Sequence, residues 1–571
     1  MATTRKLWKT RKFAQLIFIT TFSIMLILAI YSMKEKHQTK YVLKEKTEEY
    51  AEYRHGKNEK KSSTLNFDTS NYVKIIGIND DIDKVSFKDK AEDFSASAFR
   101  GLKIVHLDLK GAPPKSTYYA DFFPFIRKLG ASGVLIEYED MFPYSSIDAA
   151  AHNAYTRDEI DSIMKLANES SLEVIPLIQT FGHLEFLLKL EKYKHLRENS
   201  KYPQAICPSK NETLQILFSL IDEILDAHKN IKYIHIGCDE VYQIGQCNDC
   251  KEKLYQNKWN NKHLMLNHIT TLAKYINKKT GGNIKPLIWD DELRLIPLNE
   301  LQQWEIGNLV EPVIWKYTAD VENYLVDELW QKYSVIFKAV WFASAFKGAR
   351  YPNSYTTYSN YYFENHKSWM NLLYKYSEKI FFRGGILTGW QRYDHFAVLC
   401  ELLPVSIPSL ALNLIYLSTD IKTLIELSVK TQRVCGCDAN PVMATAPHGS
   451  CTFPGACLYI AVTRLPQIGF ALQREKDRSH YKGWMSNYNM KFSFSNPSHI
   501  EFATNNFLSI YAELNDIERD IRQCMDNIYD NSTVEEWVFT YVSPIKEELR
   551  IAIDSRNKIL SKDAWPKRPF F

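Results

Sequence analysis

Two adjacent carboxylates, Asp239 and Glu240, follow a largely apolar run from Ile231 to Ile236. Neighbouring carboxylates disfavour each other's ionised forms, so one can keep a proton near neutral pH and act as a general acid while the other stays charged. Asp and Glu are also favoured where a helix begins, so the pair alone does not separate catalysis from helix capping. The pair is therefore a candidate acid–base site that needs support from the rest of the chain.

Eight short apolar segments alternate with amphipathic segments beyond Gly101, a pattern typical of repeated βα units. The predicted strands lie at residues 104–109, 134–138, 174–178, 233–237, 286–289, 312–315, 335–341 and 385–390. Eight parallel strands of this spacing fit an α/β fold of the (β/α)8 TIM-barrel type, which we expect at residues 101–415.

Polar and aromatic side chains gather where these predicted strands end, which is the edge at which barrel enzymes build their sites. The polar ones include Asp108, Lys110, Glu137, Glu139, Asp140, Gln179, His183, Tyr317, Arg392 and Tyr393, and the tryptophans are Trp289, Trp315, Trp341 and Trp390. Four tryptophans at four strand ends favour a pocket with flat aromatic walls, suited to stacking on sugar rings, over simple core packing.

An uncharged apolar run at residues 13–33 is long enough to cross a bilayer as one helix. Basic residues precede it and no small-residue cleavage site follows it, so we expect an uncleaved signal anchor with a cytoplasmic tail at 1–12. The charged, apolar-poor segment at 34–100 then reads as a stem and lead-in. These features predict a type II membrane protein with its bulk in the lumen of the Golgi or another secretory compartment, and a cleaved signal peptide is the alternative.

The net charge of +4, from 71 basic and 67 acidic residues, gives no electrostatic case for binding nucleic acid. After about Tyr416 the βα rhythm stops, and apolar residues recur at helical intervals between Ile510 and Ile528 and between Ile545 and Leu560. We therefore expect a mainly helical region at 416–571 and assign it no chemistry.

Ten cysteines include the pair Cys247 and Cys250 and a C-terminal cluster of Cys435, Cys437, Cys451 and Cys457. In an oxidising lumen disulfides are the default, whereas in the cytosol a metal knuckle would be conceivable. We expect disulfides in the C-terminal cluster and no bound metal.

Three segments of the chain resemble the exo-β-N-acetylhexosaminidases of glycoside hydrolase family 20, and most closely the hexosaminidase D branch. They are residues 106–114, 135–144 and 235–240. The last is similar to the family's His-x-Gly-Gly-Asp-Glu signature, with Cys238 in place of the second glycine. Residues 174–183 also resemble the family's third strand and its loop histidine.

The resemblance implies a retaining, substrate-assisted mechanism in which the sugar's own acetamido oxygen attacks the anomeric carbon. Glu240 would protonate the leaving oxygen and later serve as the base for water, and Asp239 would hold the acetamido N–H and stabilise the oxazolinium-like intermediate. The substrate would be a terminal β-linked N-acetylglucosamine or N-acetylgalactosamine of a glycoconjugate, and neither a metal nor an organic cofactor is needed.

The resemblance also implies which residues bind the sugar. Trp289, Trp315 and Trp390 match the family tryptophans around the acetamido methyl, His183 matches the loop histidine near the acid, and Trp341 stands at the corresponding strand end. The chain departs from the family at Phe342, where a tyrosine usually binds the acetamido oxygen, so Tyr317 and Tyr393 become candidates for that hydroxyl. Glu137 and Glu139 replace a His-x-His pattern, and we include Glu139 and Asp140 among the candidate substrate-binding residues.

Two other interpretations stay open at this stage. One is a membrane-anchored glycan-binding module on a catalytically degenerate barrel, which would need the tryptophans but not a protonated carboxylate. The other is a different barrel enzyme, such as a lyase with Lys110 as a Schiff base. The sequence does not fix the oligomeric state, a homodimer being one option.

Overall fold

The computed structural model describes residues 98–569 except residue 422 and residues 443–448. The predicted membrane span at 13–33 and nearly all of the predicted stem lie outside the described residues. Within the described part of the chain, no helix combines the length and apolarity that a membrane crossing requires.

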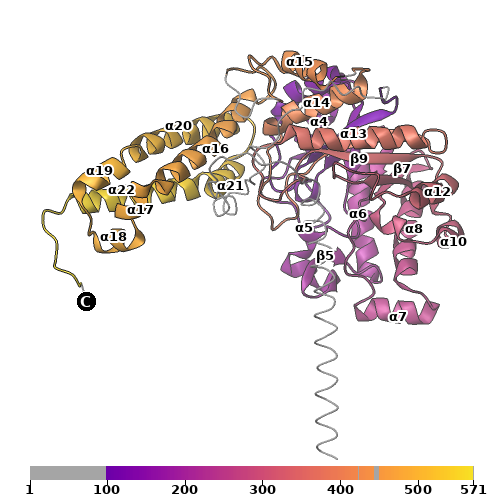
Figure 1. The fold of residues 1–571 in the computed structure, drawn as a ribbon. Helices are drawn as coiled ribbons and strands as arrows, with labels where there is room; N and C mark the ends of the chain where they lie inside the picture. Colours follow the sequence, from indigo (N-terminus) through magenta and orange to yellow (C-terminus); the bar gives the residue numbers. More distant parts are fainter. Residues whose placement is uncertain (1–97, 422, 443–448, 570–571) are drawn as a thin grey trace, which may run out of the picture. The chain divides into compact units, whose positions relative to one another are not determined.

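Eight parallel strands close into one barrel, with the spatial order β1-β10-β9-β8-β7-β6-β3-β2 (Figure 1). They are β1 (Leu102–Asp108), β2 (Gly133–Glu137), β3 (Glu173–Leu177), β6 (Tyr233–His235), β7 (Lys285–Trp289), β8 (Glu311–Trp315), β9 (Val340–Lys347) and β10 (Phe382–Gly389). Closure comes from β1, which pairs in parallel with β10 on one side and with β2 on the other. The predicted TIM barrel is confirmed.

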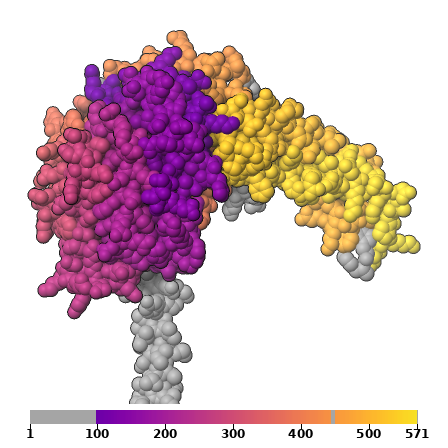
Figure 2. Space-filling model, turned by 180° about the vertical axis from the view of Figure 1, so that it is seen from behind, coloured from indigo at the N-terminus to yellow at the C-terminus, as the bar shows by residue number. Residues whose placement is uncertain are grey.

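Helices follow the strands in the alternating order of this fold. They include α3 (Tyr119–Lys128), α4 (Arg157–Glu169), α6 (Asn211–Ala227), α8 (Asn261–Thr280), α12 (Asp327–Ile336), α13 (Ser359–Tyr376) and α14 (Ile407–Ser418). In α4, a capping box between Thr156 and Glu159 satisfies the first backbone N–H groups, and Ile160 and Ile163 bury one face. Figure 2 shows the first half of the barrel, indigo to magenta, as one continuous surface.

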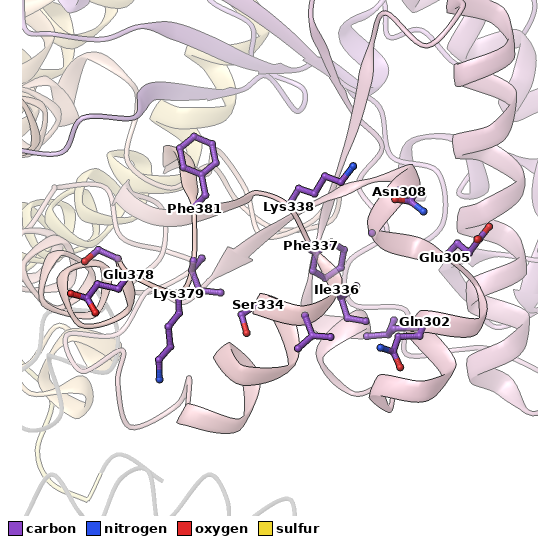
Figure 3. Close-up of a pocket in the computed structure, with 15 residues that line it drawn as sticks. Gln302, Glu305, Asn308, Ser334, Ile336, Phe337, Lys338, Glu378, Lys379 and Phe381 are labelled. Carbon is purple, nitrogen blue, oxygen red and sulfur yellow. The ribbon is translucent and has the colours of Figure 1, made fainter.

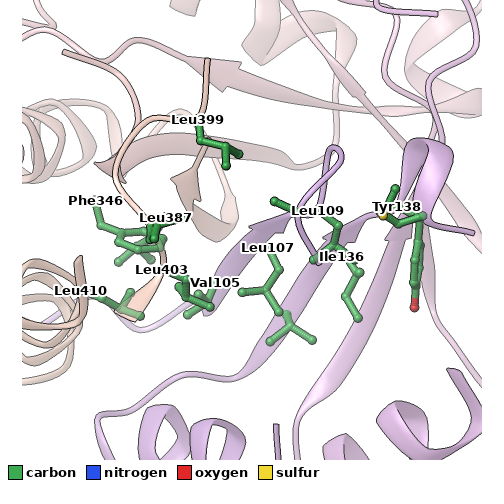
Figure 4. Close-up of a cluster of buried hydrophobic side chains, with 14 of the residues drawn as sticks. Val105, Leu107, Leu109, Ile136, Tyr138, Phe346, Leu387, Leu399, Leu403 and Leu410 are labelled. Atoms are coloured by element: carbon green, nitrogen blue, oxygen red, sulfur yellow. The ribbon is translucent and has the colours of Figure 1, made fainter. Parts of the chain in front are cut away.

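The barrel strands are apolar on both faces because each face is covered. Inward-pointing side chains such as Ile104 and Leu135 fill the barrel interior. Alternate residues point outward against the helices, where Val105 and Leu387 belong to the same buried cluster as Leu410 of α14 (Figure 4). Full burial of each such aliphatic side chain stabilises the fold by roughly 1.5–3 kcal/mol, which is why the strands read as continuous apolar runs.

The seventh strand differs from the prediction, and this moves Trp341. The strand was expected at 335–341, but Val335 and Ile336 end α12, and β9 begins at Val340. Trp341 is therefore the second residue of its strand, not the last, and lies at the amino end of the barrel. It is fully buried there, and its indole Nε1 donates to Glu311 Oε2 at 2.8 Å. The run of Val335 to Phe337 resembles a strand in composition, but it is the end of α12, where Val335 is 62% exposed and Phe337 is buried.

The C-terminal region is helical, as expected. Its longer helices are α15 (Leu424–Cys435), α16 (Ala456–Asp477), α20 (Phe507–Asp526), α21 (Asn531–Tyr541) and α22 (Ser543–Leu560). Disulfides join Cys437 to Cys451 and Cys457 to Cys524. The predicted disulfides are thus present for three of the four clustered cysteines, whereas Cys435 is a buried free thiol.

Candidate active site

A small cavity of about 220 Å³ opens at the carboxyl ends of the barrel strands. It is lined by Lys110, Glu137, Gln179, His183, Asp239, Glu240, Trp289, Trp315, Tyr317, Gly348, Ala349, Trp390, Arg392 and Tyr393. These residues lie at or just after the carboxyl ends of all eight strands, so the barrel brings together side chains that are far apart in sequence. Eight of the predicted site residues line this one cavity: Asp239, Glu240, His183, Trp289, Trp315, Trp390, Tyr317 and Tyr393.

His183 links the two adjacent carboxylates. Its Nε2 lies 3.2 Å from Glu240 Oε2 and 3.6 Å from Asp239 Oδ2. The Asp239 side chain is only 9% exposed, whereas that of Glu240 is 34% exposed towards the cavity. The second oxygen of Asp239, Oδ1, is buried and has no hydrogen-bond partner. A buried carboxylate oxygen without a donor is costly, so the site is built to receive an N–H or O–H group there.

The loop that carries the pair has an unusual backbone. Gly237 (φ 65°), Cys238 (φ 69°) and Glu240 (φ 49°) all adopt positive φ, as does His183 (φ 53°) on the facing loop. Positive φ is favourable only for glycine, which explains why the family signature has a second glycine where this chain has Cys238. Gly182 on the facing loop cannot be replaced by a larger residue without a clash, because a Cβ there would lie 2.1 Å from the Asp239 carbonyl oxygen.

Three side chains from outside the loop hold this backbone in place. Asp291 Oδ2 accepts the Glu240 N–H at 2.8 Å, and Glu292 Oε1 accepts the Val241 N–H at 3.1 Å. Gln204 Nε2 donates to the Glu240 carbonyl at 3.1 Å. Because the other oxygen of Asp291 accepts the Trp315 indole N–H at 3.1 Å, one carboxylate fixes both the acid loop and a pocket wall.

Burial and His183 push the pKa values of the two carboxyl groups apart. Burial raises the pKa of Asp239 to about 7, against the opposing charge of His183. Although burial alone would raise the pKa of Glu240, its hydrogen bond to His183 and the charge of that ring lower it below the usual range. Burial disfavours the imidazolium, but the adjacent carboxylates raise the pKa of His183 to about 10. Of the two carboxyl groups, Asp239 therefore has the higher affinity for a proton.

Aromatic rings form the wall opposite the acid pair. Trp315 stacks on Tyr317 with ring centroids 5.3 Å apart, and Tyr317 meets Trp390 edge-on at 6.5 Å. Trp390 lies 6.0 Å from Trp289. The sequence prediction of a cavity with tryptophan walls therefore describes three of the four tryptophans, and Trp341 is the exception.

Lys110 organises a buried charge cluster beside the cavity. Its Nζ lies 3.0 Å from Asp108 Oδ1, 3.3 Å from Glu139 Oε1 and 3.7 Å from Glu137 Oε1. Although burial disfavours the ammonium, these three carboxylates raise the pKa of Lys110 well above its usual value. A Schiff base needs a neutral amine, so this environment argues against the lyase interpretation.

Glu139 and Asp140 do not line the cavity, in contrast to the expectation that they bind substrate. They belong to a short 3-10 helix, Glu139–Met141, in which both side chains are buried. Glu139 pairs with Lys110 and His395, and Asp140 Oδ2 lies 3.6 Å from His395 Nδ1. Glu137, the last residue of β2, lines the cavity instead and accepts from Gln179 Nε2 at 3.1 Å.

Arg392 lines the cavity, but its donors are occupied. Its Nε donates to the Lys110 carbonyl, and its two terminal nitrogens bind Glu536 of α21 at 2.5 and 2.6 Å. It is therefore a structural link between the barrel and the C-terminal helices, not a free group for binding sugar hydroxyls.

The sequence did not predict the role of Asp291. The predicted strand end placed only Trp289 and Asp290 near the site, whereas the carboxylate that holds the acid loop belongs to the next residue.

There is a second cleft, of about 750 Å³, and Figure 3 shows the side chains that line it. Its lining residues, among them Gln302, Ser334, Lys338 and Phe381, precede the strands β8, β9 and β10. This is the amino end of the barrel, which serves stability rather than chemistry in this fold. The lining contains no histidine or cysteine, so we assign the chemistry to the smaller cavity.

Comparisons with known proteins show what this chain is similar to. The family model "Glycosyl hydrolase family 20, catalytic domain" matches residues 125–360. Human hexosaminidase D is 35% identical over 481 residues, which cover 82% of this chain and 97% of the human protein. Bovine hexosaminidase D is 45% identical over 317 residues, which cover 55% of this chain and 91% of the bovine protein.

Proposed function

This chain belongs to glycosyl hydrolase family 20, and we propose that within this family it removes terminal β-linked N-acetylglucosamine or N-acetylgalactosamine from glycoconjugates by a retaining, substrate-assisted reaction. The names of its hexosaminidase D relatives and the family match support hydrolysis of β-N-acetylhexosaminides. The observation that carries the finer proposal is the buried, unpartnered Oδ1 of Asp239 beside Glu240.

In the proposed complex, Asp239 Oδ1 accepts the acetamido N–H of the sugar. This contact orients the acetamido group so that its carbonyl oxygen faces the anomeric carbon, and it stabilises the positive charge that develops as the oxazolinium ring closes. Glu240 donates a proton to the departing glycosidic oxygen and then takes one from the water that opens the ring. The substrate supplies the nucleophile, so no residue of the chain becomes covalently bound.

The proton must move from Asp239 to Glu240 when the sugar binds. In the empty site Asp239 has the higher affinity for it, since the pKa of Asp239 is about 7 and that of Glu240 is lowered. An N–H donated to Asp239 favours its ionised form, whereas a sugar that covers the 34%-exposed Glu240 removes water from it and favours its neutral form. Substrate binding therefore places the proton on the group that has to donate it.

Tyr317 is the better candidate for the hydroxyl that binds the acetamido oxygen. It is enclosed between Trp315 and Trp390, whereas Tyr393 is 43% exposed at the rim of the cavity. We expect Tyr317→Phe to lower kcat strongly and Tyr393→Phe to act mainly on KM. Equal effects of the two substitutions would remove this assignment.

The size of the cavity supports exo action. At about 220 Å³ it is smaller than the roughly 300–1,000 Å³ typical of sites for drug-sized ligands. Such a volume suits one terminal sugar ring and leaves the rest of the glycan outside.

The decisive experiment compares Glu240→Gln and Asp239→Asn with the wild-type protein on para-nitrophenyl and dinitrophenyl β-N-acetylhexosaminides of both epimers. Glu240→Gln should be far more damaging with the poorer para-nitrophenyl leaving group, because only that substrate needs a proton. Asp239→Asn should be damaging with both substrates, because the acetamido oxygen forms its bond to the anomeric carbon in the same step in which either leaving group departs. Full tolerance of Asp239→Asn would exclude substrate assistance, and binding without any turnover by the wild type would favour a glycan-binding module.

A further inference from the structure

A compact group of three cysteines and one glutamate lies behind the loop that carries the acid pair. Cys207 follows β5 (Tyr202–Ile206), Glu198 lies in β4 (Arg197–Asn199), and Cys247 and Cys250 begin α7 (Asn248–Asn257). One potential ligand atom from each of these four residues lies within 4.8 Å of all the others. None of these cysteines forms a disulfide.

We propose that Cys207, Cys247, Cys250 and Glu198 bind a structural zinc ion. Structural zinc sites are tetrahedral, with four protein ligands and no open position, and a Cys-x-x-Cys pair is their usual nucleus. Three thiolates and one carboxylate supply four donors. This proposal departs from the sequence expectation of no metal, and it does not depend on the proposed reaction.

The distances in the group are close to those of such a site. Cys207 Sγ lies 3.1 Å from Cys247 Sγ and 3.6 Å from Cys250 Sγ, and Cys250 Sγ lies 3.1 Å from Glu198 Oε2. Tetrahedral ligands with Zn–S bonds of about 2.3 Å stand roughly 3.8 Å apart. An ion would therefore need outward shifts of only some tenths of an ångström.

The surroundings of the group are those of a metal site. The Cys250 N–H donates to Cys247 Sγ at 3.3 Å, and the Ser209 hydroxyl donates to Cys250 Sγ at 3.1 Å, both of which stabilise thiolates. Glu198 is 2% exposed, and its Oε1 accepts the N–H groups of Gln246 and Cys247. Among the described residues no basic side chain pairs with this buried carboxylate, so a cation at Oε2 would balance its charge.

A disulfide explains the group less completely. It would join two of the three sulfurs and leave the third as a buried thiol beside Glu198, whereas a metal uses all four groups.

The location also gives the ion a structural role. Cys247 follows Glu240 by seven residues, and the β4–β5 hairpin contributes Gln204, which binds the Glu240 carbonyl. Zinc would tie this hairpin to the far end of the acid loop.

The test measures metal in the full chain, purified without chelators, by inductively coupled plasma mass spectrometry. We expect about one zinc ion per wild-type chain, a loss of most of it in Cys207→Ser and Cys250→Ser, and full retention in Cys435→Ser, which removes another buried free cysteine outside the group. Glu198→Gln should weaken retention under mild chelation, because it keeps the backbone contacts but removes the charge.

Measurements on the wild type keep the proposal testable if the variants fail to fold. Cobalt exchanged into the site should give the visible bands of a tetrahedral thiolate complex. The three thiols should resist alkylation until a chelator strips the metal. A chain without zinc in which mass spectrometry finds a disulfide between two of Cys207, Cys247 and Cys250 would overturn the proposal.

Discussion

Asp291→Asn should impair the acid loop although Asp291 lies outside the pocket lining. One oxygen of Asp291 accepts the Glu240 N–H at 2.8 Å and the other accepts the Trp315 indole N–H at 3.1 Å. Asparagine has a single acceptor, so its amide nitrogen would face one of these two N–H groups. Asp291 is thus a positioning residue that acts through Glu240 and the aromatic wall.

The size of the effect follows from the lost contact. A hydrogen bond to a charged group contributes about 1.5–3 kcal/mol, and about 1.4 kcal/mol corresponds to a factor of ten. We therefore expect kcat/KM of Asp291→Asn to fall by roughly 10- to 150-fold on the para-nitrophenyl substrate at pH 7. The loss should be clearly smaller on the dinitrophenyl substrate, because that leaving group depends less on a correctly placed acid.

Glu292→Gln is the matched control. Glu292 uses one oxygen to accept the Val241 N–H, and glutamine can keep that contact. We expect its kcat/KM to stay within about threefold of the wild type, since exposed or retained polar contacts contribute little. The reasoning is refuted if Asp291→Asn also stays in that range, or if both variants lose activity equally on both leaving groups.

Three further predictions concern the site and its supports. The kcat/KM of the wild type should fall as the pH rises through about 7, where the carboxyl pair loses its last proton from Asp239. His183→Gln should shift this decline to higher pH, because it removes the positive charge beside Asp239. A pH–rate profile of both proteins checks this. The raised pKa of Asp239 means that, between pH 3.8 and about 7, the folded state holds a proton that the unfolded state releases. The free energy of unfolding therefore falls across this range as the pH rises, by up to about 4 kcal/mol. Asp239→Asn should therefore raise Tm more at pH 8 than at pH 4 in thermal unfolding, and an equal gain at both would contradict that ionisation cost. Trp341→Phe should lower Tm through its lost bond to Glu311 but leave KM unchanged, whereas Trp315→Phe should raise KM; a KM effect of Trp341→Phe would return that residue to the pocket.

Local sequence pattern was sufficient for the barrel and for the centre of the site. Buried parallel strands are apolar on both faces and end at polar residues, so the strand ends around His183, Asp239 and Trp289 could be located without knowledge of the fold. The same pattern failed at β9, because the apolar run of Val335 to Phe337 is the end of helix α12, in which Val335 is exposed and only Phe337 is buried. Because the predicted strand ended at Trp341, this tryptophan was predicted at the carboxyl end of the barrel, whereas it lies at the amino end.

Contacts between distant segments could not be predicted. Cys207 and Cys247 are 40 residues apart, and only the fold brings their sulfurs within 3.1 Å. Likewise, the sequence around Arg392 predicts an unpaired cation at a strand end. It does not indicate that the guanidinium donates hydrogen bonds to Glu536, which lies 144 residues later. Such pairings depend on tertiary packing, which no periodicity in one segment reports.

Backbone strain connects these long-range contacts to the chemistry. Of the nine non-glycine residues with positive φ in the described part of the chain, His183, Cys238 and Glu240 line or adjoin the cavity, and Glu139 lies directly behind it. Each such residue costs roughly 1–3 kcal/mol and persists only where neighbouring contacts over-determine it. Asp291 and Gln204 supply that constraint at Glu240, and Lys110 supplies it at Glu139. The acid pair is thus held by bonds made far along the chain, which is why a single acceptor lost at Asp291 should be measurable in the reaction.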